Sequence, residues 1–161
     1  MKRLLAAALG LATSLAVVSA VPSHPAEAAI QASFEIRNQY NDNCLDVAGA
    51  NTGSGAAVHM WTCNGGANQH WHWVGDQLRS DLNDKCLDLA GTNPYDGAMV
   101  ELWDCNFQNN QMWGYNNPYL YSKLNSKYLL MVNNGLGSPV VTQGIPFPPD
   151  NRNVKWELRP V

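Results

Sequence analysis

Charged side chains are scarce in this chain: only 14% of its 161 residues are Asp, Glu, Lys or Arg, and the formal net charge is −3. The sequence also has no run of basic residues. A nucleic-acid-binding protein normally presents a basic patch to the phosphates, and a protein that lies on an anionic membrane surface needs one as well. The composition therefore argues against both kinds of partner.

Long apolar runs are also missing, except near the N-terminus. There a basic pair precedes an apolar run over residues 4–18, and an Ala-Glu-Ala stretch follows at 26–28. This order is typical of a secretory signal peptide, and the run is shorter than the roughly 20 residues that a spanning helix needs. We expect a signal peptide over residues 1–28, with the cleavage position open, and a secreted, extracellular protein without membrane insertion.

The sequence has four cysteines, Cys44, Cys63, Cys86 and Cys105, and no C-x-x-C spacing. An even number of cysteines in an exported chain favours disulfides over metal ligation or redox catalysis. The first two and the last two are each 19 residues apart, so the simplest of the three connectivities joins Cys44 to Cys63 and Cys86 to Cys105. Zinc binding by the four thiols is the alternative. We favour the disulfides and expect no metal and no cofactor.

The sequence does contain an internal repeat of 42 residues. The segment NDNCLDVAG at residue 41 returns as NDKCLDLAG at residue 83, and VHMWTCN at residue 58 returns as VELWDCN at residue 100. A third, eroded copy has Tyr128 in place of the cysteine and Leu130 in place of the aspartate. The chain therefore reads as one domain over residues 34–161, with repeats 34–75, 76–117 and 118–161.

Short strands are the expected secondary structure. Apolar residues come in runs of three to five between Gly, Asn, Asp and Pro, and no window after residue 28 has a helical apolar stripe. A period near 42 also suits a propeller blade, but a propeller needs at least four blades. We therefore expect an all-β fold, a β-trefoil of three pseudo-symmetric repeats with four short strands each, because three copies closed on one axis bury a core that no copy forms alone.

The combination of CLDV, W-x-C and NQ-x-W at matching spacing resembles the ricin B-type lectins, the QxW repeat family. The resemblance covers nearly all of the chain after the signal peptide. It implies a β-trefoil lectin, a secreted carbohydrate-binding protein for galactose-, mannose- or xylan-type glycans, with glycans or polysaccharides as its partners. A catalytic partner encoded separately is an open option, since members of this family are often fused to glycosidases or toxins.

Asp46 and Asp88 stand two residues after a cysteine in an apolar strand, where a bare carboxylate is costly to bury. One interpretation is that each caps a local turn. The functional interpretation is a carboxylate at the mouth of a shallow pocket that accepts hydrogen bonds from two adjacent sugar hydroxyls. We adopt the second interpretation.

Other polar and aromatic residues recur at fixed distances from these aspartates. The resemblance implies that Trp61 and Trp103 stack on the apolar face of a sugar ring and that Asn68 and Asn110 bond a hydroxyl; the alternative is that both tryptophans are core residues. The strand period places His59 and Glu101 on the same face as these tryptophans, where they contact ligand or are simply exposed. The expected carbohydrate-binding residues are Asp46, His59, Trp61, Asn68, Gln69, Asp88, Glu101, Trp103, Asn110 and Gln111.

Some members of the repeated pattern are expected to be structural. Gln69 and Gln111 should bond backbone groups first and ligand second. One further tryptophan per repeat should lie in the core: Trp71, Trp113 and Trp156. Because the third copy loses the polar residues, we expect two competent sites, in the first and second repeats.

Two other functional classes compete with a lectin. An enzyme is disfavoured because the sequence has no G-x-S-x-G motif and each repeat supplies a single sure carboxylate, whereas glycosidases need two. The alternative function is a secreted β-trefoil that acts by protein contact, such as a protease inhibitor, through the Pro-rich loop from Gly144 to Asn153. That function would leave the repeated Asp, Trp and Asn set unexplained.

Overall fold

The computed structural model describes residues 32–144 and 151–161. The expected signal peptide and residues 145–150 of the Pro-rich loop lie outside the described residues. Within them, regular structure consists of β-strands and short 3-10 turns. None of the helices in this part of the chain has the length and apolar content needed to cross a bilayer.

Twelve short strands follow one another along the chain, as the alternation of apolar runs and turn residues predicts. Their bounds are β1 Phe34–Asn38, β2 Cys44–Val47, β3 Ala56–Trp61, β4 His70–Val74, β5 Gln77–Ser80, β6 Cys86–Leu89, β7 Ala98–Trp103, β8 Trp113–Asn116, β9 Tyr119–Ser122, β10 Tyr128–Met131, β11 Val140–Gln143 and β12 Trp156–Pro160. The 3-10 turns are η1 Ala48–Ala50, η2 Ala67–Gln69, η3 Ala90–Thr92, η4 Asn109–Gln111 and η5 Arg152–Val154.

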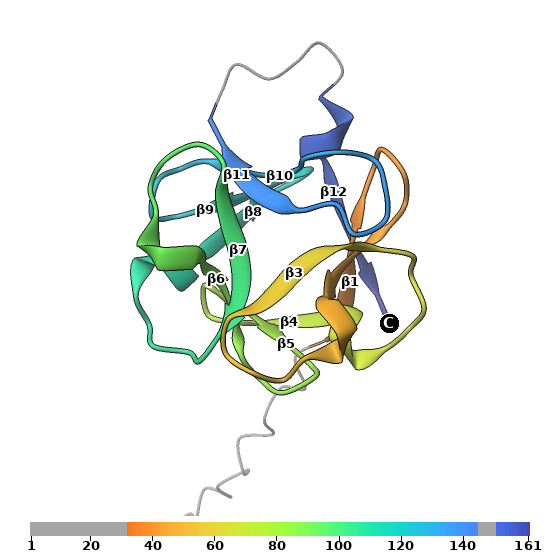
Figure 1. The fold of residues 1–161 in the computed structure, drawn as a ribbon, viewed down its shortest axis with the longest axis horizontal. Coiled ribbons are helices and arrows are strands. Elements are labelled where there is room, and N and C mark those ends of the chain that lie inside the picture. The colour runs from red at the N-terminus through yellow and green to blue at the C-terminus, as the bar shows by residue number, and fades with distance from the viewer. Residues whose placement is uncertain (1–31, 145–150) are drawn as a thin grey trace, which may run out of the picture.

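Four consecutive strands make one repeat, and the second and third strand of each form an antiparallel hairpin: β2–β3, β6–β7 and β10–β11. β3 pairs with β7, and β7 pairs with β11, so that these three strands surround the centre of the molecule in Figure 1. The remaining strands pair as β12–β1–β4–β5 and as β8–β9. The expectation of an all-β, pseudo-threefold β-trefoil is confirmed.

A glycine in each repeat connects that repeat to the next one. The backbone N–H of Gly55 donates to the Leu102 carbonyl at 2.8 Å, that of Gly97 to Thr142 at 2.9 Å, and that of Gly137 to Met60 at 2.8 Å. The three glycines have φ values of 85°, 79° and 73°, in the region where a side chain is strained. The pattern is cyclic, because the third repeat returns to the first.

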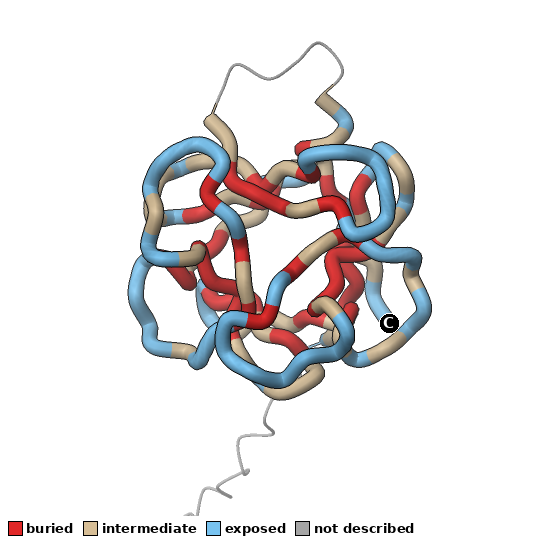
Figure 2. Tube along the Cα trace, viewed as in Figure 1, coloured by how far each residue is buried: buried red, intermediate tan, exposed pale blue. Residues whose placement is uncertain are grey.

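The core is built from the same positions of all three repeats. The tryptophans expected there, Trp71, Trp113 and Trp156, are at most 1% exposed. Each donates its indole N–H to the carbonyl of a buried leucine, at 3.1, 2.8 and 2.9 Å respectively. Figure 2 shows that buried residues gather in the strands and that exposed residues lie in the peripheral loops. The expectation that one tryptophan per repeat is a core residue is confirmed.

Two disulfides join Cys44 to Cys63 and Cys86 to Cys105, the connectivity that equal spacing favours. Each ties the start of a central hairpin strand to the loop after its partner strand. Tyr128 occupies the corresponding position of the third repeat, where no such bond can form.

Candidate functional site

Asp46 and Asp88 lie on β2 and β6, strands in which every residue is buried. The two carboxylates are 2% and 3% exposed. Across each hairpin, Asp46 is paired with His59 and Asp88 with Glu101. The repeat therefore places each carboxylate beside one ionisable residue of the neighbouring strand.

Amide donors make the burial of Asp46 tolerable. Its Oδ2 accepts hydrogen bonds from Asn68 Nδ2 at 2.8 Å and from Gln69 Nε2 at 2.7 Å, while Oδ1 lies 3.2 Å from His59 Nε2. Burial raises the pKa of the Asp46 carboxyl, and these partners oppose the rise without cancelling it. Because Oδ2 has two donors and Oδ1 has His59 alone, Oδ1 keeps more capacity to accept a hydrogen bond from a ligand.

Gln69 is fully buried and acts behind the carboxylate. Besides bonding Asp46, its amide nitrogen donates to the Thr62 carbonyl at 2.9 Å, and its oxygen accepts from the Asn64 backbone N–H at 2.7 Å. Gln111 makes the same three kinds of contact in the second repeat and is equally buried. The sequence predicts that both glutamines bond backbone groups first and ligand second; their burial and contacts agree with the first role, in which each glutamine positions the carboxylate and the loop that precedes the glutamine.

The first repeat has an open hollow of about 500 Å³ in front of Asp46. Its lining residues are Asp46, Gly49, Ala50, His59, Trp61, Asn64 and Asn68. Trp61 is 41% exposed, and its ring is stacked on that of His59 with centroids 5.4 Å apart and planes within 9°. A flat aromatic surface thus adjoins a carboxylate and an amide, which suits a ligand with one apolar face and a rim of hydroxyls.

The second repeat builds the same arrangement with different neighbours. Asp88 Oδ2 accepts from Asn110 Nδ2 and Gln111 Nε2, both at 2.8 Å, and Trp103 is 42% exposed. Glu101 replaces the histidine. Burial raises the pKa of both Asp88 and Glu101, and the Asp88 charge raises that of Glu101 further.

The loops that follow the two exposed tryptophans differ. In the first repeat the loop has Gly65 and Gly66, where the second has Phe107 and Gln108. An added Cβ at Gly66 would lie 2.5 Å from Asn68 Oδ1, so the glycine makes room for that amide. Asn110, in contrast, is 4% exposed, and its Oδ1 is buried without a hydrogen-bond partner among the described residues.

Each of these two sites is also bordered by the preceding repeat, which sequence reasoning missed. A Cβ at Gly55 would lie 3.5 Å from the Trp103 ring and 3.8 Å from Glu101 Oε2, and one at Gly137 would lie 4.0 Å from His59 Nδ1. The recurrence of Gly55 as Gly97 at the repeat offset was visible in the sequence. Its contact with the following repeat depends on closure of the trefoil and was not.

The third repeat has the same backbone arrangement with apolar residues. Leu130 pairs with Val141, the positions of the aspartate and of its ionisable partner, and Val154 stands where the glutamine was. Tyr128 pairs with Gln143 in the register in which Cys44 pairs with Trp61, so Gln143 occupies the position of the exposed tryptophan. Leu130 thus leaves the described part of the third repeat without a carboxylate at the position of Asp46 and Asp88.

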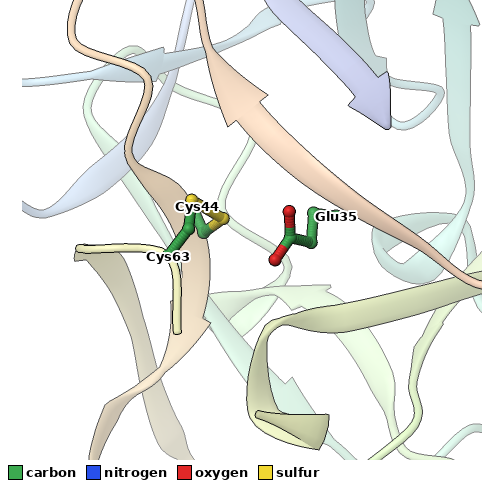
Figure 3. A group of neighbouring side chains, drawn as sticks. All are labelled: Glu35, Cys44 and Cys63. Atoms are coloured by element: carbon green, nitrogen blue, oxygen red, sulfur yellow. A yellow bond between two sulfur atoms is a disulfide. The ribbon is translucent and has the colours of Figure 1, made fainter. Parts of the chain in front are cut away.

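Glu35, Cys44 and Cys63 lie close together, with the Glu35 carboxylate beside the disulfide (Figure 3). Their potential ligand atoms are all within 4.8 Å of one another. The two sulfurs are bonded to each other and are not thiolates, the form that binds metals. The Glu35 carboxylate accepts hydrogen bonds from Arg37 at 2.8 and 2.6 Å. The group is therefore a structural crosslink next to an ion pair.

Comparison with known proteins gives a family and a fold. The family model described as "Ricin-type beta-trefoil lectin domain" matches residues 32–156. A search of curated protein sequences gives no match.

Solved structures with the same fold include a designed threefold symmetric protein, ThreeFoil, with 26% identity and a TM-score of 0.71 over 79% of this chain and 97% of that one. The C-half of the earthworm R-type lectin, solved with GalNAc, matches with 18% identity and a TM-score of 0.70 over 81% and 99%. The β-trefoil lectin of the Vibrio vulnificus hemolysin/cytolysin, solved with N-acetyl-D-lactosamine, matches with 25% identity and a TM-score of 0.64 over 81% and 96%.

Proposed function

Because the chain belongs to the ricin-type β-trefoil lectin family, we propose that it binds carbohydrate, at two shallow sites built around Asp46 and Asp88. One observation carries the proposal: a buried carboxylate, held by two amide donors, lies beside an exposed indole, and this arrangement occurs twice. The resemblance to the Vibrio vulnificus lectin domain, solved with a bound disaccharide, supports it.

In each site the carboxylate fixes the orientation of the sugar. A charged acceptor forms stronger hydrogen bonds than a neutral one, and a ring hydroxyl can donate to the oxygen that the amides leave available. Asn68 and Asn110 keep the carboxylate in place, and Trp61 and Trp103 cover the apolar face of the ring. The ligands are galactose-, mannose- or xylan-type glycans.

The protein acts by binding rather than by catalysis. Across their hairpins Asp46 faces a histidine and Asp88 faces Glu101, so only one of the two repeated sites has a pair of carboxylates, whereas glycoside hydrolysis needs two in each active site. The protein is exported by its N-terminal signal peptide, which is then cleaved. The two disulfides support export, because disulfides persist in oxidising compartments. Residues 34–161 constitute the lectin domain.

Binding to a glycan array and retention on galactose, mannose and xylan columns test the proposal. We expect retention of the wild type on at least one support, about a tenfold loss of affinity at one site in Asp46→Asn or Asp88→Asn, and no retention of the double variant on the galactose and mannose columns. Trp61→Ala and Trp103→Ala should weaken binding similarly. Gln143→Ala, the matched change in the third repeat, should leave binding unchanged. A folded wild-type protein that binds none of these glycans would contradict the proposal.

A further inference from the structure

Four positions of the third repeat depart together from the other two repeats. The corresponding sets are Glu35, Arg37, Asp42 and Cys44; Gln77, Arg79, Asp84 and Cys86; and Tyr119, Tyr121, Ser126 and Tyr128. In the first two repeats the arginine forms an ion pair with the aspartate, at 3.0 and 2.9 Å, and the cysteine forms a disulfide. Two of the three repeats therefore fold without aromatic residues at these four positions. The fold does not require the tyrosines of the third repeat.

Tyr121 lies directly on the backbone of the neighbouring strand. It pairs with Gly114, and a Cβ at Gly114 would come within 2.4 Å of the ring atom Cζ. The corresponding pair in the β4–β5 hairpin is His72 and Arg79. Gly114 thus makes room for the Tyr121 ring. Together they replace the polar pair His72 and Arg79 with an aromatic surface.

Two hollows meet at Tyr121. One, of about 450 Å³, is lined by Trp73, Gly75, Asp76, Trp113, Gly114, Tyr115, Tyr121 and Lys123. The other, of about 210 Å³, is lined by Asn116, Tyr119, Tyr121, Ser126 and Tyr128. We call their shared surface the aromatic groove and define it by Trp73, Tyr115, Tyr119, Tyr121 and Tyr128. Edge-to-face contacts, with Tyr128 centred 5.4 Å from Tyr119 and 6.5 Å from Tyr121, fix these rings relative to one another.

The groove combines half-buried aromatic rings with polar groups and carries no unbalanced charge. Its one carboxylate, on Asp76, is paired with the Lys123 ammonium at 2.7 Å. Trp73 and Tyr121 are partly buried, and neither the Tyr121 hydroxyl nor the Trp73 indole N–H is among the buried polar atoms that lack a partner in the described part of the chain, so both polar groups can be reached from the surface. Packing alone would be served by apolar side chains, so donors at the rim of an aromatic surface indicate a ligand with its own hydroxyls.

We propose that the aromatic groove is a separate carbohydrate-binding site, which takes a neutral, linear polysaccharide across at least two consecutive sugar units. Two hollows joined at one ring match a chain of sugars better than a single terminal sugar. The groove shares no residue with the sites at Asp46 and Asp88, because it is formed by β4 and the turn after it, β8, β9 and the start of β10, and those sites by β2–β3 and β6–β7 with their following loops. It goes beyond the proposed lectin sites and can exist without them.

The test uses the full chain with Asp46→Asn and Asp88→Asn, which disables the two lectin sites. Oligosaccharides of one to six units from xylan, cellulose and galactan are titrated by calorimetry. We expect the hexamer of at least one series to bind, with about tenfold higher affinity than the dimer, since longer chains cover both hollows.

The matched variant adds Gly114→His, Tyr121→Arg and Ser126→Asp, which installs the ionic residues of the second repeat and should abolish the remaining binding. Tyr121→Leu, which removes the hydroxyl and the aromatic face with a smaller change, is used if the triple change does not fold. Loss of all oligosaccharide binding in the Asp46→Asn, Asp88→Asn protein overturns the groove and leaves the lectin sites standing. Binding that survives both Tyr121 variants overturns it as well. The groove is supported if binding increases with oligosaccharide length, is unaffected by the aspartate changes and is lost when Tyr121 is changed. This outcome would support the groove even if the sites at Asp46 and Asp88 bind no sugar.

Discussion

Asp46 and Asp88 are carboxylates at strand positions that solvent barely reaches, and the charged form of each is stabilised by two amides, with His59 as a further partner of Asp46. Amide donors oppose the cost of burial but do not remove it, and the pKa of each carboxyl stays raised. An arginine or lysine paired with each carboxylate would lower its pKa further and occupy the oxygen that a sugar hydroxyl needs. The raised pKa is therefore a direct consequence of keeping the acceptor available.

This electrostatic balance predicts that carbohydrate binding weakens on acidification earlier than an exposed aspartate would titrate. Protonation converts the accepting oxygen into a neutral group, and a raised pKa moves that step to higher pH. We expect affinity to fall as the pH decreases, and the fall to begin above the pH at which an ordinary aspartate titrates, measured by calorimetry. Affinity that stays constant to about pH 4 would contradict the assignment of the carboxylates as ligand acceptors.

The raised pKa also makes the free energy of unfolding depend on pH. For an acid whose pKa is raised in the folded state, the folded protein holds its proton more tightly, so stability is greatest below the unfolded pKa and is lost as the pH rises through the folded pKa. Asp46→Asn removes this contribution, and the difference in unfolding free energy between variant and wild type should favour the variant more at pH 7 than at acidic pH. Urea unfolding of both proteins across this pH range checks the sign.

At the scale of one element, the loop between β3 and β4 decides how accessible the first site is. Gly66 gives Asn68 its place, whereas Gln108 carries a side chain at the matching position of the second repeat. The two sites therefore share a buried carboxylate held by two amides and differ in the loop that borders it.

Gly66→Ala should displace Asn68 and weaken sugar binding at the first site by about tenfold, with little effect on overall stability, because the Gly66 backbone is in an extended region open to any residue. Binding is measured in the Asp88→Asn background, where only the first site remains. Gln108→Ala in the Asp46→Asn background is the control and should leave the second site unchanged. Equal behaviour of the two variants would show that Gly66 does not position Asn68.

At the scale of the whole molecule, asparagines close the ring of repeats. Asn83 Nδ2 donates to the Thr52 carbonyl at 3.1 Å, Asn125 to Pro94 at 3.3 Å, and Asn41 to Asn134 at 3.3 Å. Each asparagine oxygen also accepts a backbone N–H two residues on. One side chain thus shapes a turn and holds the loop of the preceding repeat.

Asn83→Ala should lower the free energy of unfolding by about 1–2 kcal/mol, since it removes both hydrogen bonds at a partly exposed position. Asn41→Ala and Asn125→Ala should cost similar amounts, and all three variants should unfold in one cooperative transition because each repeat depends on its neighbours. Urea denaturation monitored by tryptophan fluorescence measures these values. Asn106→Ala is the comparison, because the Asn106 side chain bonds the Gln108 backbone N–H within its own repeat. A change confined to one repeat, seen as a second transition, would contradict the cyclic coupling.

Two sites on one rigid domain also predict avidity. On a surface densely coated with glycan, the wild type should bind about 100-fold or more tightly than either Asp46→Asn or Asp88→Asn, while for a soluble monosaccharide the difference should be about twofold in capacity. Surface plasmon resonance at high and low ligand density measures the contrast. Equal affinities on the dense surface would mean that the two sites cannot engage it together.

The sequence by itself determined the repeat, the strand-rich trefoil, the disulfide pairs and the three core tryptophans. These follow from local spacing, since residues at equal positions of a repeat meet equal surroundings. The tertiary structure alone decided which polar members of the repeat are reachable: the NQ-x-W motif contains both the half-buried Asn68 and the sealed Gln69, and adjacent letters cannot reveal that difference. It also brought Gly55 against the Trp103 ring and Gly114 under Tyr121. The physical reason is that closure of the ring sets contacts between repeats and between strands, and burial depends on all the neighbours of a side chain rather than on its place along the chain.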